Sequence, residues 1–195
     1  MDKKKYGIFY TPNFIIDIIL SRIDLTKNLE ILEPGCGDGR FIKSMYKKNN
    51  NINISAADIQ KKEITCLKKK YPEADLKNKS FLSNVFNNKL FDLIIGNPPY
   101  AAKITEKEKI YCREITKTLG KIKLESSVFF LIKSISLLKE NGQLAFILPS
   151  SILRVESYFQ VRNFIKKNTI IEEYETGYKY DNKVIKHAKV IVSKG

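Results

Sequence analysis

Residues that build disulfide frameworks and zinc sites are scarce in this sequence. Its three cysteines (Cys36, Cys66 and Cys112) lie far apart, form no Cys-x-x-Cys pair, and are accompanied by a single histidine, His187. This composition excludes a disulfide scaffold and a zinc site built from cysteine and histidine. We therefore expect a protein without a structural metal.

Hydrophobic residues are never gathered into one long run. A transmembrane helix needs roughly 18 or more consecutive apolar residues, and the sequence contains no such stretch. The opening Met1-Asp2-Lys3-Lys4-Lys5 leads into tyrosine and threonine-proline, unlike the apolar centre of a secretion signal. These absences predict a cytoplasmic protein with no membrane partner.

Acidic residues are outnumbered, because 35 Lys and Arg face 21 Asp and Glu and the formal net charge is +14 at pH 7. An excess of positive charge is typical of proteins that bind phosphate-bearing partners such as nucleic acids. It is equally expected from AT-rich codons, since the sequence is also rich in Asn and Ile. The charge is compatible with a nucleic-acid partner and does not establish one.

Apolar runs alternate with amphipathic stretches along the whole chain, which predicts a single α/β domain over residues 1–195. Helices are expected at 14–23, 41–48, 61–71, 127–138 and 158–167. Strands are expected at 29–32, 52–57, 81–82, 91–95, 143–148, 170–174 and 189–192. They would form one doubly wound, seven-stranded, mostly parallel sheet. Asn141-Gly142 is interpreted as the stop of the fourth helix, and the charged segment 101–123 predicts a surface helix or a mobile lid.

A glycine-rich loop, Glu33-Pro34-Gly35-Cys36-Gly37-Asp38-Gly39, joins the first predicted strand to the next helix. Glycines let a backbone turn tightly and approach a ligand beyond the carboxyl ends of the strands. A dinucleotide site would show Gly-x-Gly-x-x-Gly, and the Glu33 carboxylate would repel a pyrophosphate but suits a cationic amino group. Asp58, which ends the second predicted strand, is placed to accept hydrogen bonds from ribose hydroxyls. The alternative is a turn that merely packs strand against helix.

This loop resembles the first motif of S-adenosylmethionine-dependent methyltransferases. The resemblance implies the Rossmann-like fold of the class I enzymes and S-adenosylmethionine as cofactor, without a metal. It assigns Glu33 to the methionine part of the cofactor and Asp58 to the ribose. Further cofactor contacts are expected from the adjoining residues Pro34, Gly35, Cys36, Gly37 and Ile59.

A second motif, Asn97-Pro98-Pro99-Tyr100, follows the strand at 91–95. It resembles the Asn-Pro-Pro-Tyr motif of methyltransferases that act on amino nitrogens attached to planar systems. Such a nitrogen is a poor nucleophile because its lone pair is delocalised. The side-chain oxygen of Asn97 and the carbonyl of Pro98 can accept its two N–H groups on a turn stiffened by Pro99. Tyr100 offers a face on which an extruded base can stack. The alternative is a rigid turn that ends a strand.

A third segment indicates which group of methyltransferases the chain resembles. Tyr10-Thr11-Pro12 precedes the cofactor loop and resembles the Tyr-Thr-Pro motif of gamma-order DNA adenine-N6 methyltransferases, where it closes over the methionine end. Glu-Pro at 33–34 is typical of this group, and 129–162 resembles the end of the same domain in restriction–modification enzymes. The resemblance covers nearly the whole chain. It implies methyl transfer to the N6 amino group of adenine in DNA, with Asn97 beside both cofactor and base.

Two positions depart from the family pattern. Members usually carry an acid before the phenylalanine of the third strand, whereas Ser80 precedes Phe81 here. Serine can still form a hydrogen bond, and Phe81 can still cover the adenine of the cofactor, so both are expected in the cofactor site. A late aromatic residue usually packs against the flipped base. Tyr180 is the candidate and Tyr178 the reserve, because the spacing to Ala188 differs from the usual pattern. Each is equally compatible with a surface position.

Enzymes of this group normally carry a separate region that reads the DNA sequence, and 195 residues leave no room for one. Either the chain is a fragment, or a recognition domain or specificity subunit is a partner, or the enzyme reads little sequence. Two other functions stay open. One is an amino-methyltransferase that acts on ribosomal RNA or protein glutamine, and the other is an inactive, DNA-binding methyltransferase-like subunit.

Overall fold

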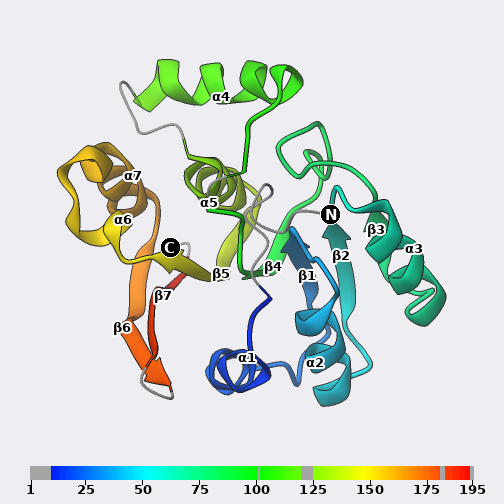
Figure 1. Ribbon diagram of the computed structural model, residues 1–195. Coiled ribbons are helices and arrows are strands. Elements are labelled where there is room, and N and C mark those ends of the chain that lie inside the picture. The colour runs from blue at the N-terminus through cyan, green and yellow to red at the C-terminus, as the bar shows by residue number, and fades with distance from the viewer. Residues whose placement is uncertain (1–9, 101, 120–124, 181–182, 194–195) are drawn as a thin grey trace.

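The computed structural model describes residues 10–100, 102–119, 125–180 and 183–193, with side chains up to Ile170 except those at 109, 115, 116 and 118. The helices in Figure 1 are α1 (Asn13–Leu20), α2 (Arg40–Lys48), α3 (Lys61–Lys70), α4 (Glu106–Leu119), α5 (Ser126–Ser136), α6 (Ser151–Arg154) and α7 (Phe159–Asn168), with a 3-10 turn at Glu156–Tyr158. The strands are β1 (Glu30–Pro34), β2 (Asn53–Ala57), β3 (Asp75–Lys77), β4 (Phe91–Gly96), β5 (Leu138–Pro149), β6 (Ile170–Tyr180) and β7 (Lys183–Ser193).

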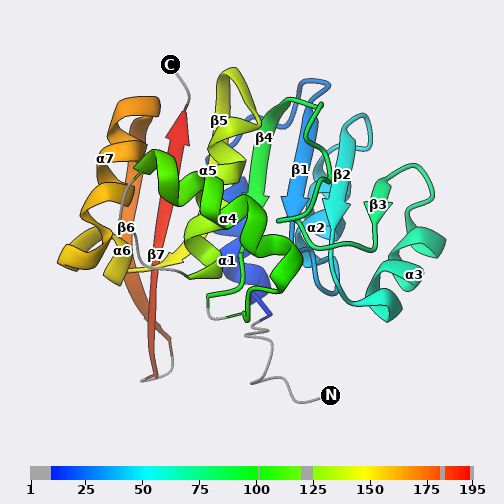
Figure 2. The same ribbon diagram turned by 90° about the horizontal axis from the view of Figure 1, so that it is seen from above.

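The strands form one seven-stranded sheet in the described part of the chain, in the order β3-β2-β1-β4-β5-β7-β6. Strands β1 to β5 are parallel, whereas β7 runs antiparallel to β5 and β6. The chain moves outward from β1 to β3 and then returns to the other side of β1 with β4, and the arrowheads of these strands point to one edge in Figure 2. Such a switch point opens a crevice for ligands. The predicted doubly wound, mostly parallel sheet is confirmed.

Helices cover both faces of this sheet (Figure 1). On one face, α1 buries Ile16, Ile19 and Leu20, which have the i, i+3, i+4 spacing of one helical side. Helix α2 likewise buries Ile42 and Met45, which lie three residues apart on one side of the helix. These side chains join one apolar core with residues of β1 and β2. The strands that carry the glycine-rich loop therefore rest on a packed layer.

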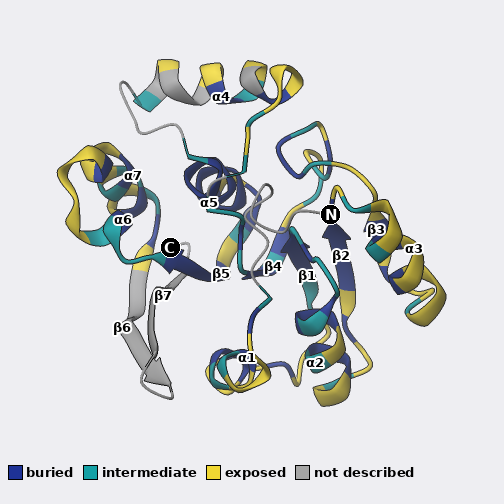
Figure 3. Cartoon of the chain, in the orientation of Figure 1, coloured by how far each residue is buried: buried dark blue, intermediate teal, exposed yellow. Residues whose placement is uncertain are grey.

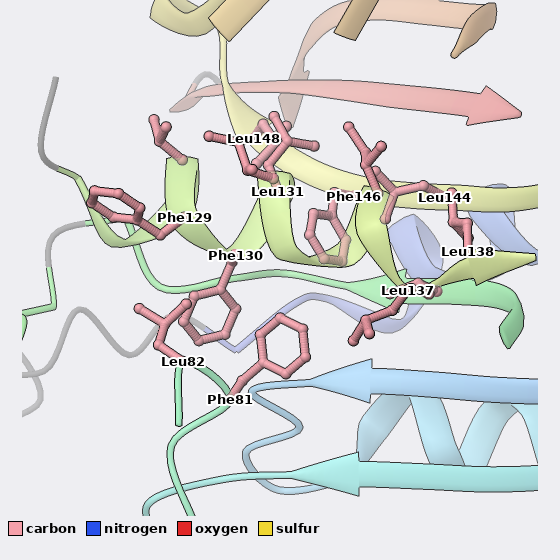
Figure 4. Close-up of a cluster of buried hydrophobic side chains, with 14 of the residues drawn as sticks. Phe81, Leu82, Phe129, Phe130, Leu131, Leu137, Leu138, Leu144, Phe146 and Leu148 are labelled. Carbon is pink, nitrogen blue, oxygen red and sulfur yellow. The ribbon is translucent and has the colours of Figure 1, made fainter. Parts of the chain in front are cut away.

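On the other face, α5 lies between the sheet and α4, and it is buried along nearly its whole length (Figure 3). Helix α4 lies further out and is largely exposed (Figure 3). This agrees with the surface helix predicted as one alternative for 101–123. Figure 4 shows the core between α5, β5 and the loop after β3. In it, the rings of Phe81 and Phe130 have their centroids 5.1 Å apart.

The prediction of a strand at 81–82 is wrong. The third strand is β3, which pairs with β2, whereas Phe81 and Leu82 lie in the loop that follows and are buried in the core next to α5 (Figure 4). Strand β3 is at the edge of the sheet and buries only Leu76, so it has no apolar run that a sequence pattern could detect. The apolar pair reflects packing of a loop.

The interpretation of Asn141-Gly142 as a helix stop is also wrong, because α5 already ends at Ser136 and β5 runs through both residues. The register against β4 shifts here, since Phe91 pairs with Leu138 but Leu93 pairs with Gln143. Asn141 has a φ of 59°, and a Cβ on Gly142 would lie 2.9 Å from two backbone carbonyl oxygens. Residues 139–142 of β5 thus lie opposite the single residue Asp92 of β4, and the dipeptide belongs to this irregularity in the strand pair.

None of the helices in the described part of the chain is long and apolar enough to cross a membrane. No group of three or more His, Cys, Asp or Glu side chains in that part of the chain is placed to hold a metal ion.

Candidate active site

A cavity of about 770 Å³ opens at the carboxyl ends of β1, β2 and β4. Most of the residues that the sequence motifs single out line it: Tyr10, Thr11, Glu33, Gly35, Cys36, Gly37, Asp58, Ile59, Ser80, Phe81, Asn97 and Pro99. Four predicted residues do not line it: Pro12 is exposed, Pro34 and Pro98 are buried, and Tyr100 is half-buried behind Asn97. Tyr178 and Tyr180 lie in β6, and their side chains are outside the described residues. The structure therefore brings three motifs, distant in sequence, to one cavity.

The glycine-rich loop is fastened to the neighbouring strand through backbone groups. The N–H groups of Gly35 and Cys36 both donate to the carbonyl oxygen of Ala57, at 2.8 and 3.1 Å. The N–H of Gly37 donates to a carboxylate oxygen of Asp58 at 2.8 Å. Gly35 and Gly37 have φ values of 73° and 51°, a left-handed conformation that favours glycine. The glycines are thus required by the path of the loop around the cavity.

Asp58 is held from two sides. Its second carboxylate oxygen accepts the N–H of Gln60 at 2.8 Å, while its own N–H donates to the carbonyl of Lys77 in β3. A carboxylate offers about four acceptor positions, and the bonds from Gly37 and Gln60 use two of them. Asp58 lines the cavity with acceptor capacity to spare, which suits a partner rich in hydroxyl groups.

Glu33 is 2 % exposed, and its Oε2 atom is buried without a hydrogen-bond partner in the described part of the chain. Burial, reinforced by the negative charge of Asp58, raises the pKa of the Glu33 carboxyl well above its usual range, although an N–H of Ile42 opposes this shift. An unpaired buried carboxyl is costly. A cationic group in the cavity would supply the missing partner.

The N-terminal segment reaches the cavity through contacts that the sequence motifs did not predict. The Arg40 guanidinium lies 5.2 Å from the ring centroid of Tyr10, donates to the carbonyl of Thr11 at 3.4 Å, and pairs with Asp38 at 2.9 Å. Arg40 also lines the cavity. One arginine on the first turn of α2 therefore connects the tyrosine-threonine segment to the glycine-rich loop. Its position directly after the last glycine is the only sequence signal that could have indicated it.

Asn97 follows β4 and is held by a partner on each side. Its Nδ2 donates to Thr11 Oγ1 at 3.2 Å, and its Oδ1 accepts the Tyr100 hydroxyl at 2.7 Å. That hydroxyl also lies 3.2 Å from the carbonyl of Ile147, but its one proton is assigned to Asn97 by the shorter distance. Burial raises the pKa of Tyr100, so it stays a donor. In this arrangement the amide oxygen of Asn97 faces the Tyr100 hydroxyl and the amide nitrogen faces Thr11.

The wall opposite the glycine-rich loop is held by side chains. Ser126 Oγ donates to the carbonyl of Pro99 at 2.6 Å and accepts the N–H of Ala102 at 3.1 Å. The Ser80 hydroxyl donates to a carboxylate oxygen of Glu108 in the first turn of α4. Sequence motifs gave no indication of Ser126 or Glu108, because neither belongs to a pattern of its own.

A buried lysine anchors the loop after β3. Lys133 is 2 % exposed, and its ammonium donates to the carbonyls of Phe81, Ser83 and Val85 at 2.7, 2.6 and 3.3 Å. The same ammonium lies 4.9 Å from the centroid of the Phe81 ring. Burial lowers the pKa of Lys133 to about 8. A lysine inside an otherwise apolar helical stretch was the available sequence signal for this role.

The strand order and the ligand crevice define the class I methyltransferase fold, and known structures agree. A protein of Listeria monocytogenes assigned to the class I S-adenosylmethionine-dependent methyltransferases superposes with a TM-score of 0.73 at 20% identity, over 94% of this chain and 59% of that one. This likeness establishes the fold.

The sequence itself is more specific. Residues 13–181 match the family described as Eco57I restriction-modification methylase. The chain belongs to this family. The resemblance of its motifs to those of restriction–modification methyltransferases is thereby confirmed.

Curated relatives agree with this assignment. The modification methylase CviBIII of Paramecium bursaria Chlorella virus NC1A is 32% identical over 84% of this chain and 43% of its own length. The type II methyltransferase M.HincII of Haemophilus influenzae is 29% identical over 89% of this chain and 34% of its own length. The chain spans less than half the length of these two relatives.

Proposed function

We propose that this chain is the catalytic domain of a cytoplasmic DNA methyltransferase, which transfers a methyl group from S-adenosylmethionine to the N6 amino group of adenine in a restriction–modification system. One observation supports this most. Asn97 at the end of β4 and Glu33 at the end of the adjacent β1 line the same cavity. A group that can hold an amine thus lies beside a group that can hold the cationic end of the cofactor.

The residues present fit this cofactor. The unpartnered Glu33 carboxyl suits its amino group, the spare acceptors of Asp58 suit ribose hydroxyls, and the apolar side chains of Ile59 and Phe81 suit a planar base. When bound, S-adenosylmethionine supplies an electrophilic methyl group. The proposed reaction does not depend on a metal or on a second cofactor.

The chain's own contribution is to hold the target nitrogen. Asn97 Oδ1 accepts one N–H of the adenine amino group, and the Pro98 carbonyl is the proposed second acceptor. Because Thr11 and Tyr100 already orient the amide, the acceptor is in place before the base arrives. The Tyr100 hydroxyl donates to that same oxygen, whose second lone pair is the proposed acceptor for the adenine N–H. No general base is required, since the methylated cation loses its proton readily.

DNA binding is proposed from charge and from the reaction itself. An adenine amino group inside a duplex is inaccessible, so the base has to be extruded. The net charge of +14 favours contacts with phosphates. Lys103 is exposed and lines the cavity, and Lys107 is exposed on the first turn of α4. We assign recognition of the DNA sequence to a region or partner subunit beyond these 195 residues.

The test is incubation of the purified chain with methyl-labelled S-adenosylmethionine and genomic DNA, followed by base-resolved analysis. We expect N6-methyladenine. Label in N4-methylcytosine would correct the target base, and label only in ribosomal RNA or a release factor would replace DNA as substrate. Absence of cofactor binding in calorimetry would favour an inactive, DNA-binding subunit.

A further inference from the structure

The strand order gives the proposed cofactor a direction along the cavity. Glu33 is the last residue but one of β1, Asp58 follows β2, and Ser80 lies in the loop after β3, the strand at the edge of the sheet. If the amino group is held at Glu33 and the ribose at Asp58, the base lies beside the loop after β3. This placement of the cofactor depends on the proposed function. It places the adenine ring near Ser80 and Phe81, where the sequence departs from its family.

A carboxylate is present at this end of the cavity, although it comes from a different part of the chain. Glu108 is 8 % exposed, lines the cavity, and accepts the Ser80 hydroxyl on Oε1. Its Oε2 accepts the N–H and the hydroxyl of Thr105, at 2.7 and 2.6 Å. Ser80 is therefore hydrogen-bonded to an acid that lies 28 residues later in the sequence.

The hydrogen bonds of Glu108 leave room for one more donor. Of the roughly four acceptor positions of a carboxylate, the contacts with Ser80 and Thr105 use three, one on Oε1 and two on Oε2. All of these groups donate to the carboxylate, so they orient it without occupying the remaining position. A donor that enters the cavity can therefore bind to Oε1.

We propose that Glu108 recognises the adenine of the cofactor by accepting a hydrogen bond from its exocyclic amino group, with Ser80 and Thr105 as positioning residues. The acid that the family pattern places next to Phe81 is supplied here from the first turn of α4. A base that carries an oxygen instead of the amino group presents an acceptor to a carboxylate, and it is rejected. Binding of the base also fastens segment 102–108 across the cavity, because Glu108 and Thr105 belong to it.

The experiment measures the affinities of S-adenosylhomocysteine and S-inosylhomocysteine for wild type and variants by calorimetry. A hydrogen bond to a charged acceptor predicts that wild type prefers the adenosyl ligand by at least about tenfold. In Glu108→Gln the preference disappears or reverses, because an amide can donate to the oxygen of the inosyl ligand. Glu114→Gln, an exposed position on the same helix, serves as the matched control and retains the wild-type ratio.

Each outcome has a distinct meaning. An unchanged ratio in folded Glu108→Gln overturns the role of Glu108 and leaves the cofactor site intact. If wild type binds neither ligand, the proposed function itself is wrong. Thermal unfolding checks the fold of each variant. Should Glu108→Gln not fold, Glu108→Asp keeps the charge but withdraws the carboxylate by one methylene, and we expect it to lower the ratio; the same ratio as wild type would refute the assignment.

Discussion

One wall of the cavity, formed by β1, β2 and the glycine-rich loop, is fastened mainly by backbone groups, with one further contact from the Gly37 N–H to the Asp58 carboxylate. The opposite wall, formed by the loop after β3, segment 102–108 and α5, is fastened by side chains that are distant in sequence. We call these the backbone wall and the side-chain wall. The backbone wall cannot shift without breaking the sheet, whereas the side-chain wall depends on a few individual residues such as Lys133 and Ser126.

The largest expected effect is at Asn97, which contacts Thr11 on one side and Tyr100 on the other. Asn97→Ala removes the acceptor for the target amine, and we expect methyl transfer to fall by about a thousandfold. Binding of S-adenosylhomocysteine should persist, because Glu33 and Asp58 are untouched. Single-turnover transfer and calorimetry measure the two quantities. Asn88→Ala, at an exposed loop position, is the control; transfer as fast as in wild type by Asn97→Ala would contradict the assigned role.

A second prediction concerns the backbone wall and pH. Burial raises the pKa of Glu33, and a cationic ligand favours the ionised carboxylate, so binding should release a proton. Below the raised pKa, cofactor affinity should therefore increase with pH by up to about tenfold per unit. Above that pKa the affinity should level off.

Calorimetry between about pH 5.5 and 7, where an α-amino group remains protonated, measures this slope and the released proton in buffers of different ionisation enthalpy. Glu33→Gln should bind more weakly and without the slope. The same slope in wild type and variant would show that another group is responsible.

The side-chain wall is tested at Lys133. Lys133→Met leaves the carbonyls of Phe81, Ser83 and Val85 without their donor, and we expect a loss of about 2 kcal/mol in the free energy of unfolding. Urea denaturation measures it, with the exposed Lys62→Met as control.

The pH dependence of stability gives an independent check at the same residue. Since the pKa of Lys133 is lowered to about 8, the folded protein loses this proton before the unfolded chain does. The wild-type stability should therefore rise relative to the variant's between about pH 8 and 10. A constant difference across this range would be evidence against a desolvated ammonium.

The smallest effect is expected for Tyr100→Phe, which keeps the ring and removes the hydroxyl that donates to Asn97. A net hydrogen bond contributes about 1 kcal/mol, so loss of this orienting contact should raise the KM for DNA by no more than about fivefold. Steady-state kinetics measures the change. A large fall in kcat would instead show that the hydroxyl assists the reaction.

The difference between the walls explains how far the sequence could be interpreted. The backbone wall was predictable, because Gly35, Asp58 and Asn97 each follow a buried strand, and the ends of adjacent parallel strands meet in space. Family membership is established, while the individual roles of these residues remain predictions. Local pattern and topology were sufficient to bring them to one cavity.

The side-chain wall was not predictable in this way. Glu108 meets Ser80 across 28 residues and Lys133 meets Phe81 across 52, and no periodicity links such pairs. The error at 81–82 has the same origin, since these residues are apolar because they pack on α5, whereas the actual strand β3 buries only Leu76. Residues that are selected by long-range packing leave no local signal.

The arrangement of β3, β2, β1 and β4 has an evolutionary consequence. On the proposed function, successive strand ends hold the base, the ribose and the amino group of the donor, while the acceptor site is confined to the last strand of the row. Mutations around Asn97 and Tyr100 can therefore change which molecule is modified without disturbing the donor. Members of such a family can evolve to modify different molecules while the site for the methyl donor stays the same.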